Sequence, residues 1–269
     1  MDNNHKKLYS CVDYYRMAFS YRDIYEECKF LSDVFHKHTG KDIENSFELA
    51  AGPADHAFHF AGKGIKAGAL DLSEEMIAYI KEHDKQNLIK TYLADMSDFK
   101  CEEEYSLAIM MLDSFAYLLT DDKIQQHFNC VADVLEENGL YIIEMDHPGS
   151  YLDSKTEKPE EETGIKWHME DNKRKVIMHW GAPGSSFDSA TQLSEIKTIL
   201  EVYNKEDNSI LKVEDKAIQR IFTANEFKLH IKLSGRFELV EQFRMFDIDK
   251  KFNCSSDGIR MISVLKKIK

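Results

Sequence analysis

The sequence lacks any apolar stretch that could cross a membrane, because its most apolar short run covers only residues 107–112. Its polar first ten residues, MDNNHKKLYS, lead into no apolar segment of signal-peptide length. Cysteines are few, and the five present are scattered and form no CxxC pair. This usage disfavours a disulfide framework and a thiolate metal site. We therefore expect a reduced, cytoplasmic protein with no membrane partner and no bound metal.

Basic residues are also scarce. The chain has 35 Lys and Arg residues against 48 Asp and Glu residues, which gives a formal net charge of −13 at pH 7. Non-specific affinity for nucleic acid comes from clustered Lys and Arg, so this balance argues against a nucleic-acid partner. With 269 residues, 43% of them hydrophobic, the chain can bury a sizeable core in one domain, or in one domain with an insertion.

Glycine is sparse in the turn that is most informative about function. A strand-like run ends at Glu48, and the small residues Ala50-Ala51-Gly52-Pro53-Ala54 follow, before a helical pattern and a second strand that ends on Asp71. Small residues after a strand let the backbone approach a ligand, and the next helix offers free N–H groups. An acid at the tip of the following strand is where a ribose is held. The pattern predicts a nucleoside-cofactor site at the open end of a parallel sheet.

Strand and helix patterns alternate about five times between residues 45 and 144, which predicts a doubly wound parallel α/β sheet. The run 105–112 is nearly continuous in apolar residues, as expected of a central strand buried on both faces. Right-handed crossovers place all the strand C-terminal ends on one edge, where ligands bind in such sheets. An acid lies at or near each of five strand ends: Glu48, Asp71, Asp95, Asp113 and Asp146.

The pattern changes after residue 148. Residues 150–162 are polar and are expected to form a loop or lid. Two alternating pairs of segments then predict antiparallel hairpins, at residues 165–180 and 193–222. Thr223 and Glu226 form a capping box that begins a helix, and two further strands complete the chain. Residues 10–40 and 121–137 show helical spacing, and Asp121 or Asp122 is expected to be the N-cap of the second segment.

Several ordered segments resemble the class I S-adenosylmethionine-dependent methyltransferases, in particular bacterial small-molecule members. The family's acid–apolar–G-x-G-x-G segment reads ELAAGPA here and retains only its middle glycine, Gly52. ALDLSEEMI, LADMSDF, LAIMMLDSFAYLL and VADVLEENGLYIIEMDHP resemble the segments that follow it in order. The resemblance implies a seven-stranded Rossmann-like sheet with an antiparallel last strand, plus an antiparallel insertion after the fifth strand. Residues 1–149 and 223–269 would bind the cofactor, with a helical lid at 10–40, and residues 150–222 would cover the acceptor.

The resemblance also assigns roles to individual residues. Glu48 would face the amino end of S-adenosylmethionine, and Asp71 would accept hydrogen bonds from both ribose hydroxyls. Leu72 and Met76 would flank the adenine ring. The remaining expected cofactor contacts are Ala50, Gly52, Asp95, Met96, Asp113, Tyr15 and Arg22.

The implied reaction is methyl transfer to a small molecule, with S-adenosylhomocysteine as the product. If the acceptor must lose a proton, Asp113, Asp146 and His147 are the nearest candidate bases. His56 and His59 are three residues apart, but no third metal ligand accompanies them. The sequence leaves open whether the protein is a monomer or a homodimer.

Two other functions stay open at this point. A nicotinamide-dependent Rossmann oxidoreductase would share the small-residue turn and the ribose acid, but the third glycine of G-x-G-x-x-G is missing. A protein that binds S-adenosylmethionine without catalysis is the other, because Ala50 and Ala54 replace two glycines of the family pattern.

Overall fold

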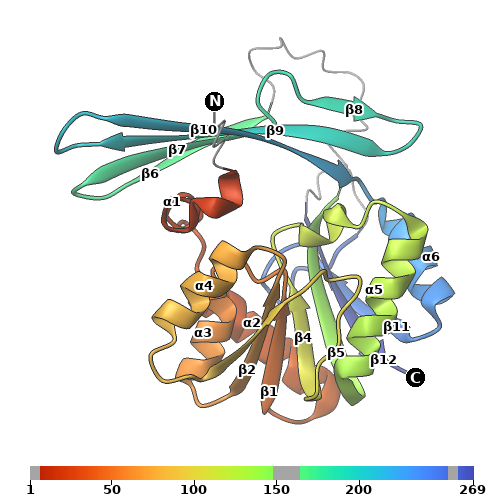
Figure 1. Cartoon of the computed structure of the whole chain (residues 1–269). Coiled ribbons are helices and arrows are strands. Elements are labelled where there is room, and N and C mark those ends of the chain that lie inside the picture. The colour runs from red at the N-terminus through yellow and green to blue at the C-terminus, as the bar shows by residue number, and fades with distance from the viewer. Residues whose placement is uncertain (1–6, 148–163, 254–259) are drawn as a thin grey trace. The chain divides into compact units, whose positions relative to one another are not determined.

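The computed structural model describes residues 7–147, 164–253 and 260–269 (Figure 1). The chain divides into two compact units. The first, called the α/β unit below, comprises residues 24–153 and 220–269, and the second, the antiparallel unit, comprises residues 1–23 and 154–219. The expected loop at 150–162 lies outside the described residues.

The α/β unit contains α2 (Ile24–Thr39), β1 (Asn45–Leu49), α3 (Asp55–Gly62), β2 (Lys66–Asp71), α4 (Glu74–His83), β3 (Ile89–Leu93), β4 (Tyr105–Met110), the 3₁₀ turn η2 (Ser114–Tyr117), α5 (Asp121–Val134), β5 (Leu135–Asp146), α6 (Ala224–Ser234), β11 (Phe237–Phe243) and β12 (Arg260–Lys267). The antiparallel unit contains η1 (Leu8–Ser10), α1 (Val12–Ala18), β6 (Ile165–Glu170), β7 (Arg174–Trp180), β8 (Ser186–Asp188), β9 (Leu193–Asn204) and β10 (Ile210–Arg220), whose last residue belongs to the other unit.

Seven strands of the α/β unit form one sheet in the order β11-β12-β5-β4-β1-β2-β3 (Figure 1). The five strands from β1 to β5 pair in parallel. β12 lies between β5 and β11 and is antiparallel to both. The predicted seven-stranded Rossmann-like sheet with an antiparallel last strand is therefore confirmed.

The central strand β4 is apolar at nearly every position, and all six of its residues are buried. Such a strand needs cover on both faces of the sheet, and helices provide it. Ala108 and Met110 pack with α5 and α6, whereas Leu107 and Ile109 pack with α2 and Phe60 of α3. Alternate side chains of a strand point to opposite faces, so this one strand contributes to two cores. Because β4 is buried along its whole length, the residues that follow it begin at the carboxyl-terminal edge of the sheet.

Two local expectations were wrong. α5 was expected to be capped by Asp121 or Asp122, but the Thr120 hydroxyl accepts the N–H of Lys123 at 3.3 Å. The two acids occupy the first turn instead, where they face the positive end of the helix dipole. The expected helical segment 10–40 is interrupted between α1 and α2, and the two helices belong to different units.

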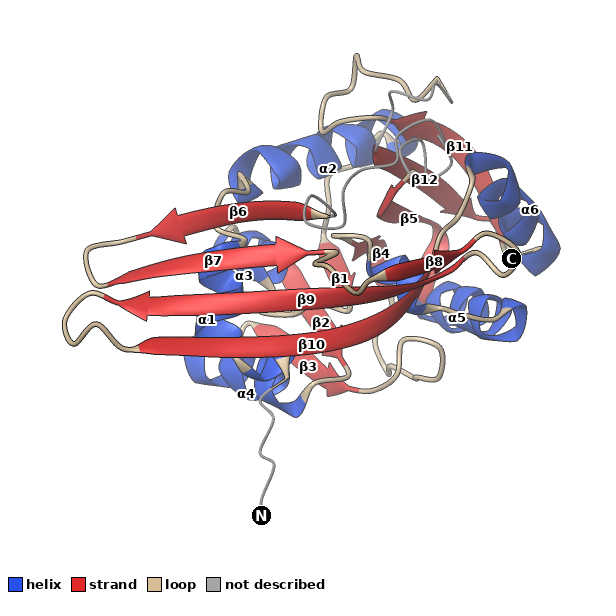
Figure 2. Ribbon diagram, turned by 90° about the horizontal axis from the view of Figure 1, so that it is seen from above, coloured by secondary structure: helices blue, strands red, loops and turns tan. Residues whose placement is uncertain are grey.

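The predicted hairpins of the insertion are confirmed. β6, β7, β9 and β10 form an antiparallel sheet in the order β10-β9-β7-β6, and β8 pairs with β9 (Figure 2). Trp167 and Trp180 are partly buried and pack against the core of this unit. The Trp167 Nε1–H donates to the carbonyl of Ala18 at 2.7 Å, which anchors the end of α1.

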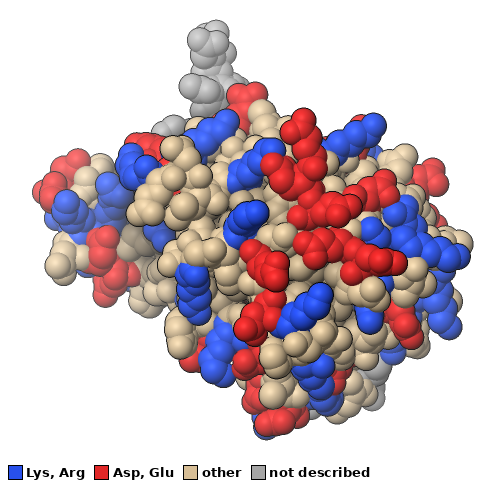
Figure 3. Space-filling model, turned by 90° about the horizontal axis from the view of Figure 1, so that it is seen from below, with Lys and Arg blue, Asp and Glu red and all other residues tan. Residues whose placement is uncertain are grey.

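Charges of both signs are interleaved on the molecular face seen from below (Figure 3). Lys and Arg side chains on this face stand beside Asp and Glu side chains and form no broad basic area among the described residues. None of the helices in the described ranges is long and apolar enough to cross a membrane.

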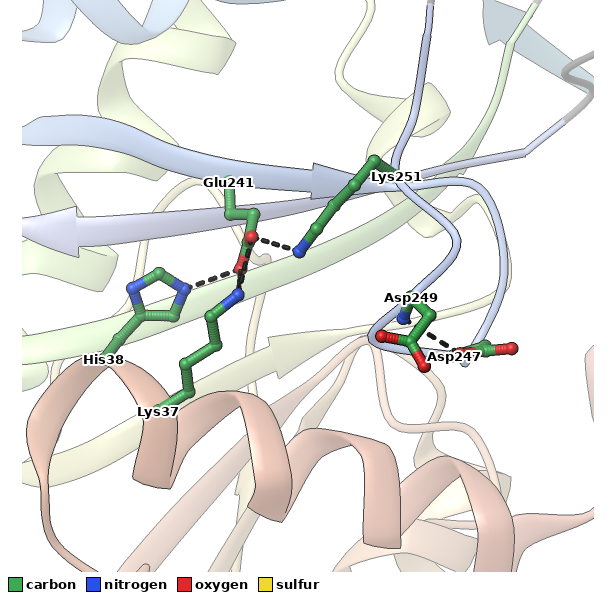
Figure 4. Close-up of polar contacts among 6 residues, drawn as sticks. All are labelled: Lys37, His38, Glu241, Asp247, Asp249 and Lys251. Carbon is green, nitrogen blue, oxygen red and sulfur yellow. Dashed lines mark hydrogen bonds and ion pairs between the residues drawn. The ribbon is translucent and has the colours of Figure 1, made fainter.

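One partly buried ion cluster fastens the β11–β12 hairpin to α2 (Figure 4). Glu241 of β11 accepts hydrogen bonds from Lys37 Nζ at 2.7 and 2.9 Å and lies 2.9 Å from Nε2 of His38. Lys251, in the segment before β12, also bonds to this carboxylate. Burial opposes ionisation and is the largest single effect, but the bonds from Lys251, Lys37 and His38 together lower the pKa of Glu241 to about 2. The Glu241 side chain is only 15% exposed, so these contacts are weakly screened.

We predict that Glu241→Gln lowers the free energy of unfolding by about 1–3 kcal/mol at pH 7, because Lys37, His38 and Lys251 lose the negative charge and one oxygen of their acceptor. The pKa of Glu241 is lower in the folded state than in the unfolded state. Its stabilisation is therefore complete above the unfolded value of 4.5 and is lost as the pH falls toward 2. Urea unfolding of both proteins between pH 3 and 7 measures this difference. As a control, Asp33→Asn breaks the exposed Lys29–Asp33 pair and should leave stability nearly unchanged at every pH. A constant difference across the pH range would contradict the assignment.

Candidate functional site

The parallel strands bring five acidic side chains to one edge of the sheet. Glu48 is the last residue but one of β1, and Asp71 and Asp146 end β2 and β5. Asp95 and Asp113 follow the ends of β3 and β4 within three residues. Because strands β1 to β5 run in the same direction, these residues share the edge at which ligands bind in open α/β sheets.

The turn after β1 has a left-handed backbone at alternate positions. Ala50, Gly52 and Ala54 have φ values of 48°, 55° and 57°, a region that residues other than glycine rarely adopt. The Ala51 N–H donates to the carbonyl of Leu70 at 2.9 Å, so the turn remains attached to β2. The chain thus keeps the backbone of a glycine-rich turn with alanine at two of its three special positions.

Asp71 joins this turn to the tip of β2. Its Oδ2 accepts the N–H of Gly52 at 2.7 Å, and its Oδ1 accepts the N–H of Ser73 at 2.8 Å. Burial raises the pKa of Asp71, which the backbone donors at Ser73 and Gly52 partly offset. A carboxylate has about four lone-pair sites, so each oxygen can accept one further hydrogen bond. This remaining capacity suits a group with two adjacent hydroxyls.

Leu72 and Met76 differ in their exposure. Leu72 is 72% exposed directly after Asp71, at the edge of the sheet. Met76 is buried on the inner side of α4, and its N–H donates to the capping hydroxyl of Ser73. Leu72 can therefore offer an apolar surface to a ring, whereas Met76 supports the turn from the interior.

Asp95 lies in a turn stabilised by side chains. Its Oδ1 accepts the N–H of Ser97 at 2.8 Å and the Ser97 hydroxyl at 2.6 Å, and Lys123 Nζ lies 3.3 Å from Oδ2. Burial opposes ionisation most strongly, but the bonds from Ser97 and Lys123 together lower the pKa of Asp95. The next residue, Met96, is half-buried and packs against the core under α5. Asp95 is thus an ionised acceptor.

Glu48 fills the amino-terminal end of α3. Its Oε2 accepts the N–H of Ala57 at 2.8 Å, and its Oε1 lies 2.9 Å from Nδ1 of His56. The helix has no side-chain cap from Ala54, so this carboxylate takes the capping position. His56 Nε2 lies 2.9 Å from Glu27 on α2, and all three side chains are buried. In the described ranges no group of three or more His, Cys, Asp and Glu residues is arranged to hold a metal ion.

Residues 47–139, which carry the turn and the first four of these acids, match the family model described as a methyltransferase domain. This part of the chain is therefore similar to a methyltransferase domain. A protein of Geobacillus sp. (strain WCH70) that is named a putative methyltransferase is 23% identical over 118 residues, or 43% of this chain. The match spans 48% of that protein, so about half the length of this curated relative is covered.

Solved methyltransferase structures share the fold of nearly the whole chain. An S-adenosylmethionine-dependent methyltransferase from Clostridium acetobutylicum ATCC 824 gives a TM-score of 0.74 at 16% identity, covering 95% of this chain and 96% of its own. CalS10 from Micromonospora echinaspora, described as an amino pentose methyltransferase with bound S-adenosylmethionine, gives 0.69 at 14% identity and covers 100% of both chains. The fold is therefore that of the class I S-adenosylmethionine-dependent methyltransferases.

Asp113 lies in a strained turn after β4. Leu112 and Asp113 have φ values of 53° and 56° in succession. Asp113 Oδ1 accepts the N–H of Asp146 at 3.1 Å, and Oδ2 has no hydrogen-bond partner among residues 7–147, 164–253 and 260–269. Burial, followed by the charge of Asp146, raises the pKa of Asp113 well above its usual range. Partial removal from water and the charge of Glu144 raise the pKa of Asp146 to about 6.

Glu144 and Arg260 support this turn, and the sequence analysis missed both. Glu144 is buried; its Oε2 accepts the N–H of Leu112 at 3.0 Å, and its Oε1 accepts the Nε–H of Arg260 at 2.9 Å. Glu144 could have been recognised from the sequence, because an acid inside the otherwise apolar run YIIEM is rare unless it is paired. Arg260, more than a hundred residues away in sequence, gave no such signal.

The other expected site residues have these positions. Tyr15 packs against Tyr9 and Phe19 within the antiparallel unit. The backbone N–H of Arg22 donates to the carbonyl of Phe19 at 3.2 Å. His147 follows β5, with its ring 5.1 Å from that of Phe252. For these three residues a contact with cofactor or acceptor stays a prediction.

We predict that Ala50→Gly raises the free energy of unfolding by about 0.5 kcal/mol. Alanine in the left-handed region costs the folded state about 1–2 kcal/mol, and glycine avoids this cost. Glycine also stabilises the unfolded chain, by about 0.4–1 kcal/mol of conformational entropy, which is the smaller of the two effects. Urea unfolding measures the difference. The same substitution at Ala78, exposed in α4, should lower stability by about 1 kcal/mol. A loss of stability at position 50 comparable to that at Ala78 would show that the turn is not strained.

Proposed function

We propose that the protein is an S-adenosylmethionine-dependent methyltransferase that acts on a small molecule by in-line methyl transfer. The observation that carries this proposal is the Glu48 carboxylate at the amino-terminal end of α3. In dinucleotide-binding folds that helix end holds a pyrophosphate. Here an anion already occupies it, and four more acids line the same edge, so the edge favours a cationic nucleoside over a phosphorylated one.

The residues present fit such a cofactor. Asp71 retains two acceptor sites, one on each oxygen, for the two ribose hydroxyls. Leu72 offers an exposed apolar surface for the base, and Asp95 offers an ionised acceptor for an exocyclic amino group. The left-handed turn at Ala50 and Gly52 brings the backbone to the ligand without intervening side-chain bulk, and the net negative charge of the edge suits the amino and sulfonium groups.

Once bound, S-adenosylmethionine supplies a methyl group already activated by its positive sulfur, so the chain need not create an electrophile. Its task is to align the acceptor with the methyl carbon and to exclude water. Asp113 Oδ2 lacks a donor within the described part of the chain and has a raised pKa, so it can receive the proton that an attacking amine or hydroxyl releases. Asp146 is the second candidate, with its pKa close to neutrality.

The acceptor belongs to the small-molecule class. The likeness to CalS10, described as acting on an amino pentose, supports amino sugars as the first compounds to test. The roles expected from the sequence for Met76, Met96, Tyr15, Arg22, His147 and the segments 10–40 and 150–222 remain part of this proposal, as does cytoplasmic location.

Neither alternative function is favoured. A nicotinamide dinucleotide would place its pyrophosphate against Glu48, and the antiparallel β12 is foreign to the doubly wound order of such oxidoreductases. A binder without catalysis was suggested by Ala50 and Ala54, but both retain the left-handed backbone of the glycine pattern.

We predict that Asp71→Ala weakens S-adenosylhomocysteine binding about 100-fold, because two hydrogen bonds to a charged acceptor are lost. Isothermal titration calorimetry measures this affinity. Asp84→Ala is the matched control, since Asp84 also accepts two backbone N–H groups, those of Leu88 and Ile89, but follows α4 at the opposite end of the strands. Asp84→Ala should lose stability and keep its affinity. Equal affinities in the two variants would exclude the ribose role of Asp71, and failure of the unmodified protein to bind would exclude the function.

We also predict that the preference for S-adenosylmethionine over S-adenosylhomocysteine increases with pH. The two ligands differ by the positive charge on sulfur, and Asp146 becomes ionised as the pH rises through its pKa of about 6. We expect the ratio of the two dissociation constants to change about fivefold between pH 5 and 7.5, which corresponds to roughly 1 kcal/mol of charge attraction. Asp146→Asn should flatten this dependence. A ratio that is independent of pH in the unmodified protein would place Asp146 away from the sulfur.

A further inference from the structure

One face of α5 makes hydrogen bonds to the segment that follows β3. Lys123, His127 and Cys130 are spaced four and three residues apart, so their side chains lie on the same side of the helix. Lys123 Nζ donates to the Ser97 hydroxyl at 2.8 Å, His127 bonds to the carbonyl of Met96 at 2.7 Å, and the Cys130 thiol lies 3.7 Å from the carbonyl of Ser97. Three successive helical contacts therefore converge on residues 95–97.

His127 is the one fully buried side chain of these three. It has no exposed surface, and burial lowers its pKa to about 4, so the ring is neutral at physiological pH. A carbonyl only accepts hydrogen bonds, so Nδ1 carries the proton and donates to Met96. Nε2 must then accept, and the hydroxyl of Tyr141, itself buried and 2.7 Å away, donates to it. The tautomer is thus fixed from both sides.

Lys123 acts on the side chain of the same segment. It lies 3.3 Å from Asp95 Oδ2, while Ser97 bonds to Oδ1. An ionised carboxylate has no hydrogen to donate, so Asp95 can accept from a base that carries an amino group but cannot donate to one that carries a carbonyl group. His127 determines where the backbone of the segment lies, and Lys123 holds the Asp95 carboxylate and the Ser97 hydroxyl in place.

We propose that His127 is a positioning residue that holds the Asp95–Ser97 segment, through the carbonyl of Met96, in the geometry that recognises a 6-aminopurine base. Lys123, on the same helical face, holds the Asp95 carboxylate in the orientation that accepts from the amino group. This inference rests on the proposed function, because the base belongs to the cofactor. It adds residues from α5, a helix that contributes none of the side chains expected to touch the cofactor.

The test uses two amide substitutions that separate the two ring nitrogens. In His127→Asn, the new side-chain amide nitrogen can occupy the position of Nδ1 and donate to Met96. In His127→Gln, the longer side chain extends to the position of Nε2 and keeps only the bond to Tyr141. We expect His127→Gln to weaken S-adenosylhomocysteine binding about tenfold in calorimetry, and His127→Asn to bind within about threefold of the unmodified protein.

A second probe distinguishes positioning from a general structural role. S-ribosylhomocysteine lacks the base, so its affinity should be the same in His127→Gln and the unmodified protein. Tyr141→Phe removes the hydroxyl but leaves the Met96 bond, so it should lower the melting temperature without changing the S-adenosylhomocysteine affinity. Equal weakening of both ligands by His127→Gln, or unchanged binding of S-adenosylhomocysteine in that variant, would overturn the proposal.

Lys123→Met provides an independent test on a half-exposed side chain that should not affect folding. S-inosylhomocysteine carries a carbonyl oxygen in place of the 6-amino group. We expect the preference for S-adenosylhomocysteine over this analogue to fall at least roughly fivefold in Lys123→Met, and Lys123→Arg to restore it. An unchanged preference would overturn the role of α5 even if His127→Gln does not fold. If the unmodified protein binds neither adenosine ligand, the proposed function fails instead.

Discussion

The hydrogen bond from the Gly52 N–H to the Asp71 carboxylate is the contact on which the ligand-binding edge depends. It joins the end of β1 to the end of β2 across nineteen residues of chain. The same carboxylate bonds to the first residue before α4, so one side chain organises two turns. Asp71 is costly to bury as an anion, and its raised pKa reflects that cost. A ligand that donates two hydroxyl hydrogen bonds would offset this cost. The Asp71 carboxylate can therefore be unfavourable in the ligand-free protein and favourable in the complex.

The acidic side chains at this edge of the sheet determine its local charge. Glu48 stabilises the start of α3 and, in doing so, removes the helix end as a phosphate site. His56 lies between Glu48 and Glu27, within hydrogen-bond distance of both carboxylates. At the end of β4, burial and then the charge of Asp146 raise the pKa of Asp113. These acids are the basis on which we propose a cationic ligand at this edge.

The sequence predicted those parts of the fold that depend on local periodicity. The acids were found because a parallel sheet converts strand ends into a common edge, and the hairpins because alternation and turn residues are local signals. The same reasoning misplaced the cap of α5, since Thr120 and Asp121 are equally acceptable until the helix geometry decides. It also missed Arg260 and the α5 face with His127, because their partners are distant in sequence and are determined by how helices pack on the sheet. The left-handed alanines were recognised as small residues, but their strain is visible only in the backbone angles.

The position of β12 has a consequence for biosynthesis. This strand is near the end of the chain, yet it lies inside the sheet between β5 and β11. During synthesis on the ribosome, the edges of β5 and β11 that pair with β12 therefore have no partner until residues 260–267 have been made. Exposed strand edges are templates for pairing with other chains. A nascent chain that stops before residue 260 therefore lacks the central partner of both strands, although it already contains all five acids of the candidate site.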